Sequence, residues 1–183
     1  MKIVLAITGA SGAVYAQRVL AFLRKTNHQV EIIASRNGTQ IYQQEVGASL
    51  KEWDYKIYAN DDFTAPFASG SAQYDLLAII PCSTGTLSRI ATGISDDLVT
   101  RTADVFLKER RKIILVPRET PFSSIHLENM LKLSNLGVVI LPANPSFYSK
   151  PKNLVEAVDT VTARILDHMG IQHDLKIRYG QDC

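Results

Sequence analysis

The chain has 183 residues, of which 46% are apolar and 21% are charged, and its formal net charge is +2. This composition is ordinary for a soluble globular protein, and the near-neutral charge argues against a nucleic-acid or membrane-surface partner. No apolar run approaches the length of a membrane span. The two cysteines lack disulfide or metal-ligand spacing and no signal peptide is visible, so we expect a reducing, cytoplasmic location.

Short apolar runs recur along the chain and predict buried β-strands. They cover residues 3–7, 30–33, 76–80, 113–116 and 138–141. Segments with helical spacing cover residues 14–23, 87–91, 101–108, 125–136 and 154–168. Strands that are apolar throughout and alternate with helices are typical of a parallel sheet covered on both faces. The pattern predicts one doubly wound, mostly parallel α/β domain over residues 1–183.

Three segments carry more specific expectations. The helix over residues 125–136 should bury one apolar stripe and stop at Gly137. That stripe consists of Ile125, Leu127, Met130, Leu131, Leu133 and Leu136. Residues 48–71 show no clear periodicity and predict a loop, with a small-residue end at 68–71 that could flex over a site. The tail from residue 172 alternates apolar and polar residues without a partner strand, which is typical of an arm that docks on another subunit.

Small, polar or proline-rich residues follow each predicted strand, at the edge where doubly wound sheets bind ligands. They lie at residues 9–11, 35–37, 81–86, 117–119 and 142–145. In the first stretch, Gly9 and Gly12 surround Ser11 between a strand and a helix. Glycines there let a phosphate approach the first N–H groups of the helix, which have no partner within it. This glycine turn predicts an anion site, with a ligand-free turn as the alternative.

The sequence lacks two features of a dinucleotide-binding site, and this indicates the type of nucleotide. A dinucleotide site needs G-x-G-x-x-G and an acid at the end of the second strand. Here the middle glycine is missing, the second strand ends at Ser35, and Glu31 lies at the start of that strand. A mononucleotide with a single phosphate, such as FMN, is therefore favoured over NAD.

Other reactive groups give weaker indications. Arg101 and Lys108 fall on one face of a predicted helix, ~10 Å apart along its axis, where they are either a phosphate-binding strip or solvated surface charges. Cys82 has no basic neighbour in sequence to lower its pKa, so we expect a small buried residue and not a nucleophile. Ser11 stands in G-x-S-G and not in the G-x-S-x-G of a nucleophile elbow. The histidines are scattered without triad or zinc spacing, and no metal site is predicted.

Several blocks in a fixed order resemble the flavin prenyltransferases of the UbiX type, over nearly the whole chain. The blocks are residues 8–13, 68–71, 81–88, 101–105, 107–111, 116–121, 125–130 and 145–148. The resemblance implies a flavodoxin-like or Rossmann-like domain that forms trimers and then a homododecamer, with reduced FMN between subunits. The last helix and arm, about residues 153–183, would contribute to the site or to the oligomer.

The family's reaction joins a dimethylallyl group from dimethylallyl phosphate to N5 and C6 of reduced FMN, without a metal. The product, prenylated FMN, serves a partner decarboxylase in ubiquinone biosynthesis or aromatic-acid decarboxylation. Carried over by resemblance, the FMN contacts are Gly9, Ala10, Ser11, Ser35, Ser83, Thr84, Gly85, Thr86 and Arg101. The dimethylallyl phosphate contacts are Tyr148, Arg164, Lys108, Arg118 and Glu119.

The resemblance also implies catalytic roles. Ser11 and Glu45 would lie near N5 of the flavin and handle its proton. Lys108 would stabilise the leaving phosphate, and Glu119 would shuttle a proton through that phosphate. The pocket would be completed by residues of a neighbouring subunit.

Alternatives and one departure remain. A flavin-dependent cysteine decarboxylase has a similar fold but carries a P-A-S-A-N-like loop, from which residues 81–85 depart. An aromatic-acid decarboxylase would need an acid–base arrangement that we do not find. A simple FMN carrier would have no use for Tyr148, Arg164 and Glu119 together. In the family a tryptophan usually follows the tail arginine, whereas this chain has Arg178-Tyr179, so the tail is either an aromatic lid or only a subunit contact.

Overall fold

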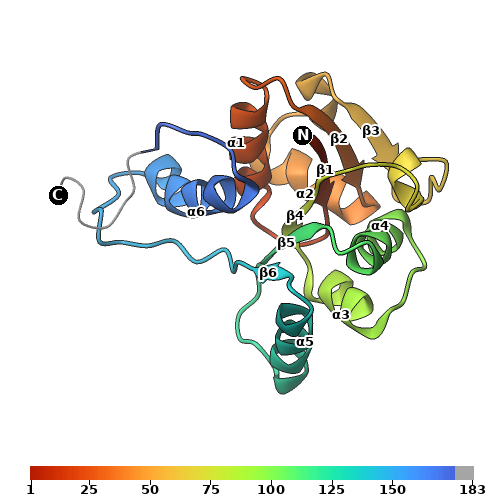
Figure 1. The fold of residues 1–183 in the computed structure, drawn as a ribbon. Coiled ribbons are helices and arrows are strands. Elements are labelled where there is room, and N and C mark those ends of the chain that lie inside the picture. The colour runs from red at the N-terminus through yellow and green to blue at the C-terminus, as the bar shows by residue number, and fades with distance from the viewer. Residues whose placement is uncertain (176–183) are drawn as a thin grey trace.

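The computed structural model describes residues 1–175 and contains one six-stranded sheet in which every paired strand is parallel (Figure 1). The strands are β1 (Lys2–Ile7), β2 (Gln29–Ala34), β3 (Lys56–Ala59), β4 (Leu76–Cys82), β5 (Lys112–Pro117) and β6 (Val139–Ile140). Their order is β3-β2-β1-β4-β5-β6. The order reverses between β1 and β4, which puts the ligand crevice of a doubly wound sheet at their carboxyl ends. The predicted fold class is confirmed.

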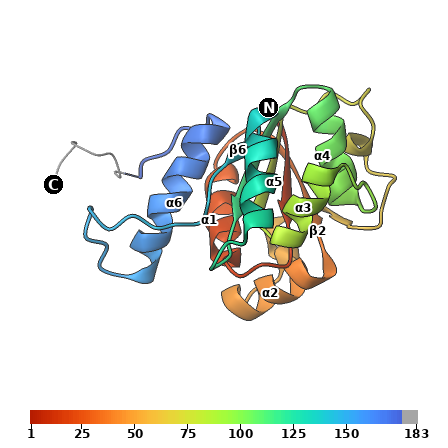
Figure 2. The same ribbon diagram turned by 90° about the horizontal axis from the view of Figure 1, so that it is seen from below.

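Helices cover both faces of the sheet. They are α1 (Ala13–Leu23), α2 (Arg36–Val46), α3 (Thr84–Thr92), α4 (Leu98–Lys108), α5 (Ser124–Asn135) and α6 (Leu154–Met169), with short 3₁₀ helices at Leu50–Trp53 and Pro66–Ala68. Figure 2 shows α1 and α6 on one side and α3, α4 and α5 on the other. Side chains of β1 alternate between the two cores, with Leu5 in the core under α1 and α6 and Ala6 in the core under α3 and α4. This alternation is the two-residue period of a strand buried on both faces.

Two elements were absent from the sequence-based prediction. The stretch expected to be a loop contains β3, an edge strand in which only Tyr58 is buried. Helix α2 was not predicted either, because its apolar residues are few: Tyr42 is buried, and Ile41 and Val46 are only partly buried against the core. Both elements are recognisable only once the neighbouring strands are in place. No helix within the described residues is long and apolar enough to cross a membrane.

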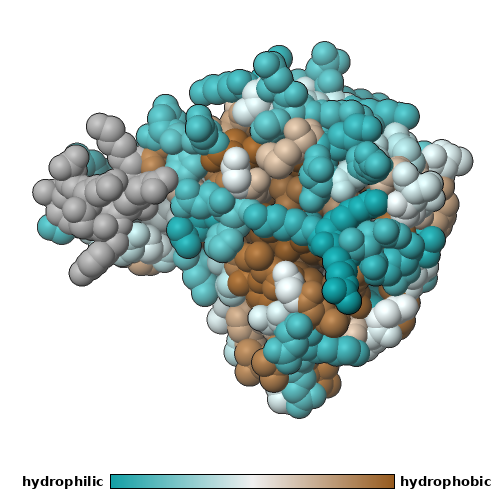
Figure 3. Space-filling model, viewed as in Figure 1, coloured by the Kyte–Doolittle hydropathy of each residue, from teal (hydrophilic) through white to brown (hydrophobic). Residues whose placement is uncertain are grey.

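The predicted buried stripe of α5 is wrong. Only Met130 and Leu133 are buried, whereas the exposed fractions of Leu127 and Leu131 are 54% and 64%. Ile125 and Leu136 are exposed as well. The helix carries apolar residues on more than one face, and the sheet covers only one of them. Apolar surface is visible over α5 at the bottom of Figure 3.

Gly38 lets α2 begin close against the end of β1. The Ser35 N–H donates to the Ile7 carbonyl oxygen at 3.0 Å. A Cβ atom added at Gly38 would overlap that same oxygen and lie 2.8 Å from the Ile7 carbonyl carbon. Gly85, in the first turn of α3, has no atom within 4 Å of an added Cβ.

We therefore predict opposite effects for two helical Gly→Ala substitutions. Gly38→Ala should lower the free energy of unfolding by about 1–3 kcal/mol, because the added methyl group overpacks the start of α2. Gly85→Ala should leave it unchanged or raise it by up to ~1 kcal/mol through helix propensity. Urea unfolding of flavin-free protein at one protein concentration measures both. Equal stability of the two variants would contradict the close approach of α2 to β1.

Candidate functional site

Thr8 joins the carboxyl ends of β1 and β4. Its hydroxyl donates to the Pro81 carbonyl oxygen at 2.9 Å and accepts from the Ser83 N–H at 2.8 Å. The residue is only 2% exposed, so water does not compete for these hydrogen bonds. The glycine turn after β1 and the hydroxyl-rich loop after β4 are therefore held side by side. This is the arrangement expected for loops that follow neighbouring parallel strands.

The anion at the N-terminus of α1 is the chain's own carboxylate. Gly12 caps this helix in the left-handed conformation, at φ 109°, and no side chain of the turn itself caps the helix. Instead the Glu45 carboxylate, from the last turn of α2, accepts from the N–H groups of Gly12 and Ala13, both at 2.8 Å. In this structure the Glu45 carboxylate therefore occupies the position at which the glycine turn predicts a ligand anion.

Glu45, Ser11 and Arg118 form one polar cluster beside the glycine turn. Burial alone would raise the pKa of the Glu45 carboxyl. Hydrogen bonds from the Ser11 side chain and from the two turn amides outweigh that effect, together with the positive charge of Arg118, so the pKa lies below its ordinary value of 4.5. Arg118 Nε also donates to the Ser11 carbonyl oxygen at 3.2 Å. The structure thus brings together Ser11 and Glu45, the pair assigned by resemblance to one proton-handling role.

A cavity of about 290 Å³ lies between the N-termini of α2 and α3. Ser35 caps α2 by accepting from the Gly38 N–H at 3.0 Å, and Ser83 caps α3 by accepting from the Thr86 N–H at 3.3 Å. The remaining first-turn N–H groups of both helices have no helical partner, and both macrodipoles favour an anion here. The lining residues are Thr8, Gly9, Ser35, Arg36, Asn37, Asn60, Ser83, Thr86, Arg89, Asp97 and Val99. This cavity suits a phosphate better than the N-terminus of α1.

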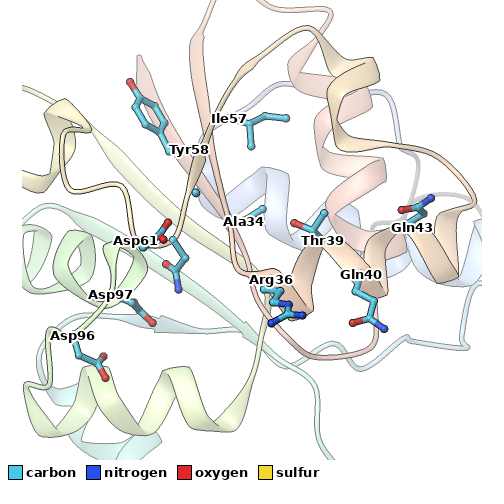
Figure 4. Close-up of a pocket in the computed structure, with 12 residues that line it drawn as sticks. Ala34, Arg36, Thr39, Gln40, Gln43, Ile57, Tyr58, Asp61, Asp96 and Asp97 are labelled. Atoms are coloured by element: carbon cyan, nitrogen blue, oxygen red, sulfur yellow. The ribbon is translucent and has the colours of Figure 1, made fainter.

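A larger open groove of about 810 Å³ adjoins this cavity, and Arg36, Asn60 and Asp97 line both. Figure 4 shows Asp96 and Asp97 on the side of the groove opposite α2. Sequence reasoning missed the groove because β3 and α2, which form much of its wall, were not predicted. The acid pair ahead of α4 was visible in the sequence, but nothing in its spacing indicated a cavity.

Arg101 and Lys108 do not line the cavity between α2 and α3. Arg101 Nε donates to the Ala68 carbonyl oxygen at 3.1 Å, and its Nη1 lies 3.2 Å from the Asp104 carboxylate. Lys108 ends α4 and pairs with Glu109. Helix α4 begins beside the cavity and ends just before β5, so Lys108 lies at the opposite edge of the sheet.

The expected flexible loop lies along α4. Arg111 donates to the carbonyl oxygens of Gly70 and Ala72, both at 2.7 Å. These bonds tie the loop to the end of the helix.

The other residues assigned to the prenyl donor lie in three places. Glu119 follows Arg118 and accepts from the Thr120 N–H at 3.0 Å. Tyr148 is 47% exposed and belongs to the segment before α6. Arg164 is exposed on α6 and donates to Asp167 at 3.0 Å. One chain therefore supplies these groups from separated elements.

The remaining expectations concern the tail, the cysteine and metals. Arg178 and Tyr179 lie outside the described residues. Cys82 is buried, and burial raises the pKa of its thiol to about 12, as suits a structural residue. Residues 1–175 contain no group of three or more histidine, cysteine or acidic side chains that could hold a metal ion.

Known proteins are similar to this chain in sequence and in fold. A family model described as flavoprotein matches residues 1–176. The flavin prenyltransferase UbiX of Methanocaldococcus jannaschii is 49% identical over 185 residues, which cover 98% of this chain and 99% of that protein.

Two solved structures have folds that closely match the fold of this chain. A dodecameric FMN-dependent UbiX-like decarboxylase from Escherichia coli O157:H7 has a TM-score of 0.94 and 40% identity, covering 98% of this chain and 99% of its own. AnUbiX (PadA1), in complex with FMN and dimethylallyl pyrophosphate, has a TM-score of 0.89 and 39% identity, covering 93% of each chain. This chain belongs to the flavoprotein family and, within it, to the UbiX flavin prenyltransferases.

Proposed function

We propose that this protein transfers a dimethylallyl group from dimethylallyl phosphate to N5 and C6 of reduced FMN. The product is prenylated FMN, the cofactor of a partner decarboxylase in ubiquinone biosynthesis or aromatic-acid decarboxylation. The observation that carries the proposal is a cavity of about 290 Å³ at two helix N-termini beside the Ser11–Glu45–Arg118 cluster, in a chain of this family. Reduced FMN supplies the electron-rich ring that accepts the prenyl group.

The FMN phosphate would occupy the cavity between α2 and α3. Gly9, Ser35, Ser83 and Thr86 line it, and Ala10, Thr84 and Gly85 adjoin them in sequence. The cavity is smaller than a whole flavin, so the ring would extend past the glycine turn toward Ser11. Arg101, which points to the Ala68 carbonyl, would reach the FMN of a neighbouring copy.

The dimethylallyl phosphate would bind next to the flavin ring. Loss of phosphate from an allylic ester leaves negative charge on the phosphate and positive charge on the five-carbon fragment. Lys108, Arg118 and Arg164 would stabilise the first charge in place of a metal ion, and the face of Tyr148 would stabilise the second. Lys108 and Arg118 stand at opposite edges of one sheet, so this pocket needs more than one copy of the chain.

The exposed apolar surface supports such an assembly. Phe147 and Leu154 are 69% and 73% exposed, in addition to the outward residues of α5. Large apolar side chains exposed in such number are typical of surfaces that another protein copy covers. We propose a homo-oligomer of single flavin-binding domains, trimers that form a dodecamer, in which residues 153–183 contribute to the site or to the contacts. The reaction would take place in the cytoplasm, where reduced flavin and the free thiol of Cys82 are both preserved.

The direct test is the mass of the flavin. The protein is incubated without oxygen with reduced FMN and dimethylallyl phosphate, and the extracted flavin is weighed by mass spectrometry. We expect FMN to gain one five-carbon prenyl group. An unchanged mass, with the diphosphate as donor too, would contradict the proposal. Release of CO₂ from an aromatic acid by this protein alone would instead make it a decarboxylase.

Glu119 should matter for turnover and not for flavin binding. We predict that Glu119→Gln binds FMN as the wild type does but forms the new ring at least about tenfold more slowly, because the amide cannot shuttle a proton. Stopped-flow absorbance and the product mass measure the effect. Glu128→Gln, at an exposed carboxylate on α5, is the control. Full turnover by Glu119→Gln would remove Glu119 from the mechanism.

Glu45 should give the fold a pH-dependent stability. Its folded pKa is lowered, so its contribution is complete above the ordinary value of 4.5 and disappears as the pH falls through the lower folded value. We predict that Glu45→Gln unfolds at lower urea than the wild type at pH 7, and that the difference narrows toward pH 3. Glu128→Gln reports the effect of removing an exposed carboxylate. If the difference in urea midpoint between Glu45→Gln and the wild type did not depend on pH, the ionised Glu45 would not stabilise the N-terminus of α1 as described.

A further inference from the structure

Arg89 is a cation at the wall of the cavity between α2 and α3 that no sequence motif had indicated. It lies on α3 one turn after Thr86 and lines the cavity together with both capping serines. Its Nη2 is 3.5 Å from Thr86 Oγ1 and 3.2 Å from Asp97 Oδ2. The guanidinium is thus held between the first turn of α3 and Asp97, the N-cap of α4, at the wall of the cavity.

The hydrogen-bonding capacity of Arg89 is only partly used. Its Nε is buried and has no hydrogen-bond partner among the described residues. The Asp96 carboxylate lies 3.9 Å from this nitrogen, beyond hydrogen-bond range. A guanidinium carries five N–H donors. The buried Nε cannot reach a ligand, but Nη1 has no hydrogen-bond partner among the described residues and can donate to one.

Asp97 fixes the position of this guanidinium without enclosing it. One carboxylate oxygen of Asp97 caps α4, where it accepts from the Thr100 N–H at 2.8 Å, and the other pairs with Arg89. Asp97 is thus held by the helix that it caps. The Arg89 side chain remains 38% exposed. Figure 4 shows Asp97 next to Asp96 at the edge of the adjoining groove.

We propose that Arg89 binds the phosphate of FMN in this cavity, an inference that rests on the proposed flavin function. Ser35, Ser83 and Thr86 are neutral, and the helix N-termini supply only partial charges. A phosphate monoester is close to a dianion at neutral pH, and a guanidinium, here shared with Asp97, offers it a planar fork of charged donors. Of the residues lining the cavity, Arg36 and Arg89 are cationic, and α3 and Asp97 both hold Arg89 in place.

Because Arg89 contacts the phosphate and not the ring, it should determine the preference for FMN over riboflavin. The test is flavin titration of the intact protein, followed by fluorescence quenching. We expect Arg89→Gln to raise the Kd for FMN about tenfold or more and to leave the Kd for riboflavin within about twofold. Arg89→Lys, which keeps the charge but loses the fork, should fall between the two. Arg24→Gln, at an exposed arginine beyond the end of α1, should match the wild type.

Two results would overturn the role of Arg89. One is unchanged FMN affinity in Arg89→Gln, and the other is an equal loss for FMN and riboflavin, which would show a structural role alone. If Arg89→Gln does not fold, the same comparison with Arg89→Lys decides, and equal FMN affinity to the wild type overturns the proposal. A wild type that binds riboflavin as tightly as FMN would also refute it. A wild type that binds FMN but does not prenylate it would refute only the proposed chemistry.

Discussion

Thr8 connects the first and fourth strands at the point where the strand order reverses. Its hydroxyl links the Pro81 carbonyl to the Ser83 N–H, and Thr8 itself is buried. Because the loop after β4 is held in this way, the Ser83 cap of α3 lies beside the glycine turn. The cavity, which is lined by Thr8, Gly9, Ser83 and Arg89, depends on the loops being joined here. A parallel sheet without this link would still bury its strands, but the two loops would be free to separate.

The same edge contains two kinds of helix N-terminus. The N-terminus of α1 is neutralised internally, since Glu45 accepts from its first N–H groups. The N-termini of α2 and α3 are capped only by Ser35 and Ser83, so part of their positive potential still faces the cavity. This division separates binding from chemistry. In the proposed function the phosphate binds at the uncompensated pair of helices, and the ionised Glu45 stays next to Ser11 to handle the proton of N5.

The fold class could be predicted from the sequence because it depends on strand segments whose residue pattern has only one simple interpretation. The apolar runs that became β1, β4 and β5 have no polar positions, so a strand buried on both faces was the simple interpretation. The prediction missed elements that are stabilised mainly by tertiary contacts. Strand β3 buries only Tyr58, and α2 has few apolar residues, of which only Tyr42 is fully buried. Strand ends alone predicted five loops at one edge of the sheet, and residues of three of them, Gly9, Ser35 and Ser83, line the cavity. The contact of Glu45 with the glycine turn was not predictable from spacing, because it joins residues 32 and 33 positions apart.

The account depends most on where the flavin phosphate binds. A crystal structure of the protein with FMN measures this directly. We expect the phosphate between the N-termini of α2 and α3, within hydrogen-bond distance of the loops at Ser35 and Ser83, with Glu45 still bound to Gly12 and Ala13. A phosphate on the amides of Gly12 and Ala13, with the Glu45 carboxylate displaced, would contradict the account.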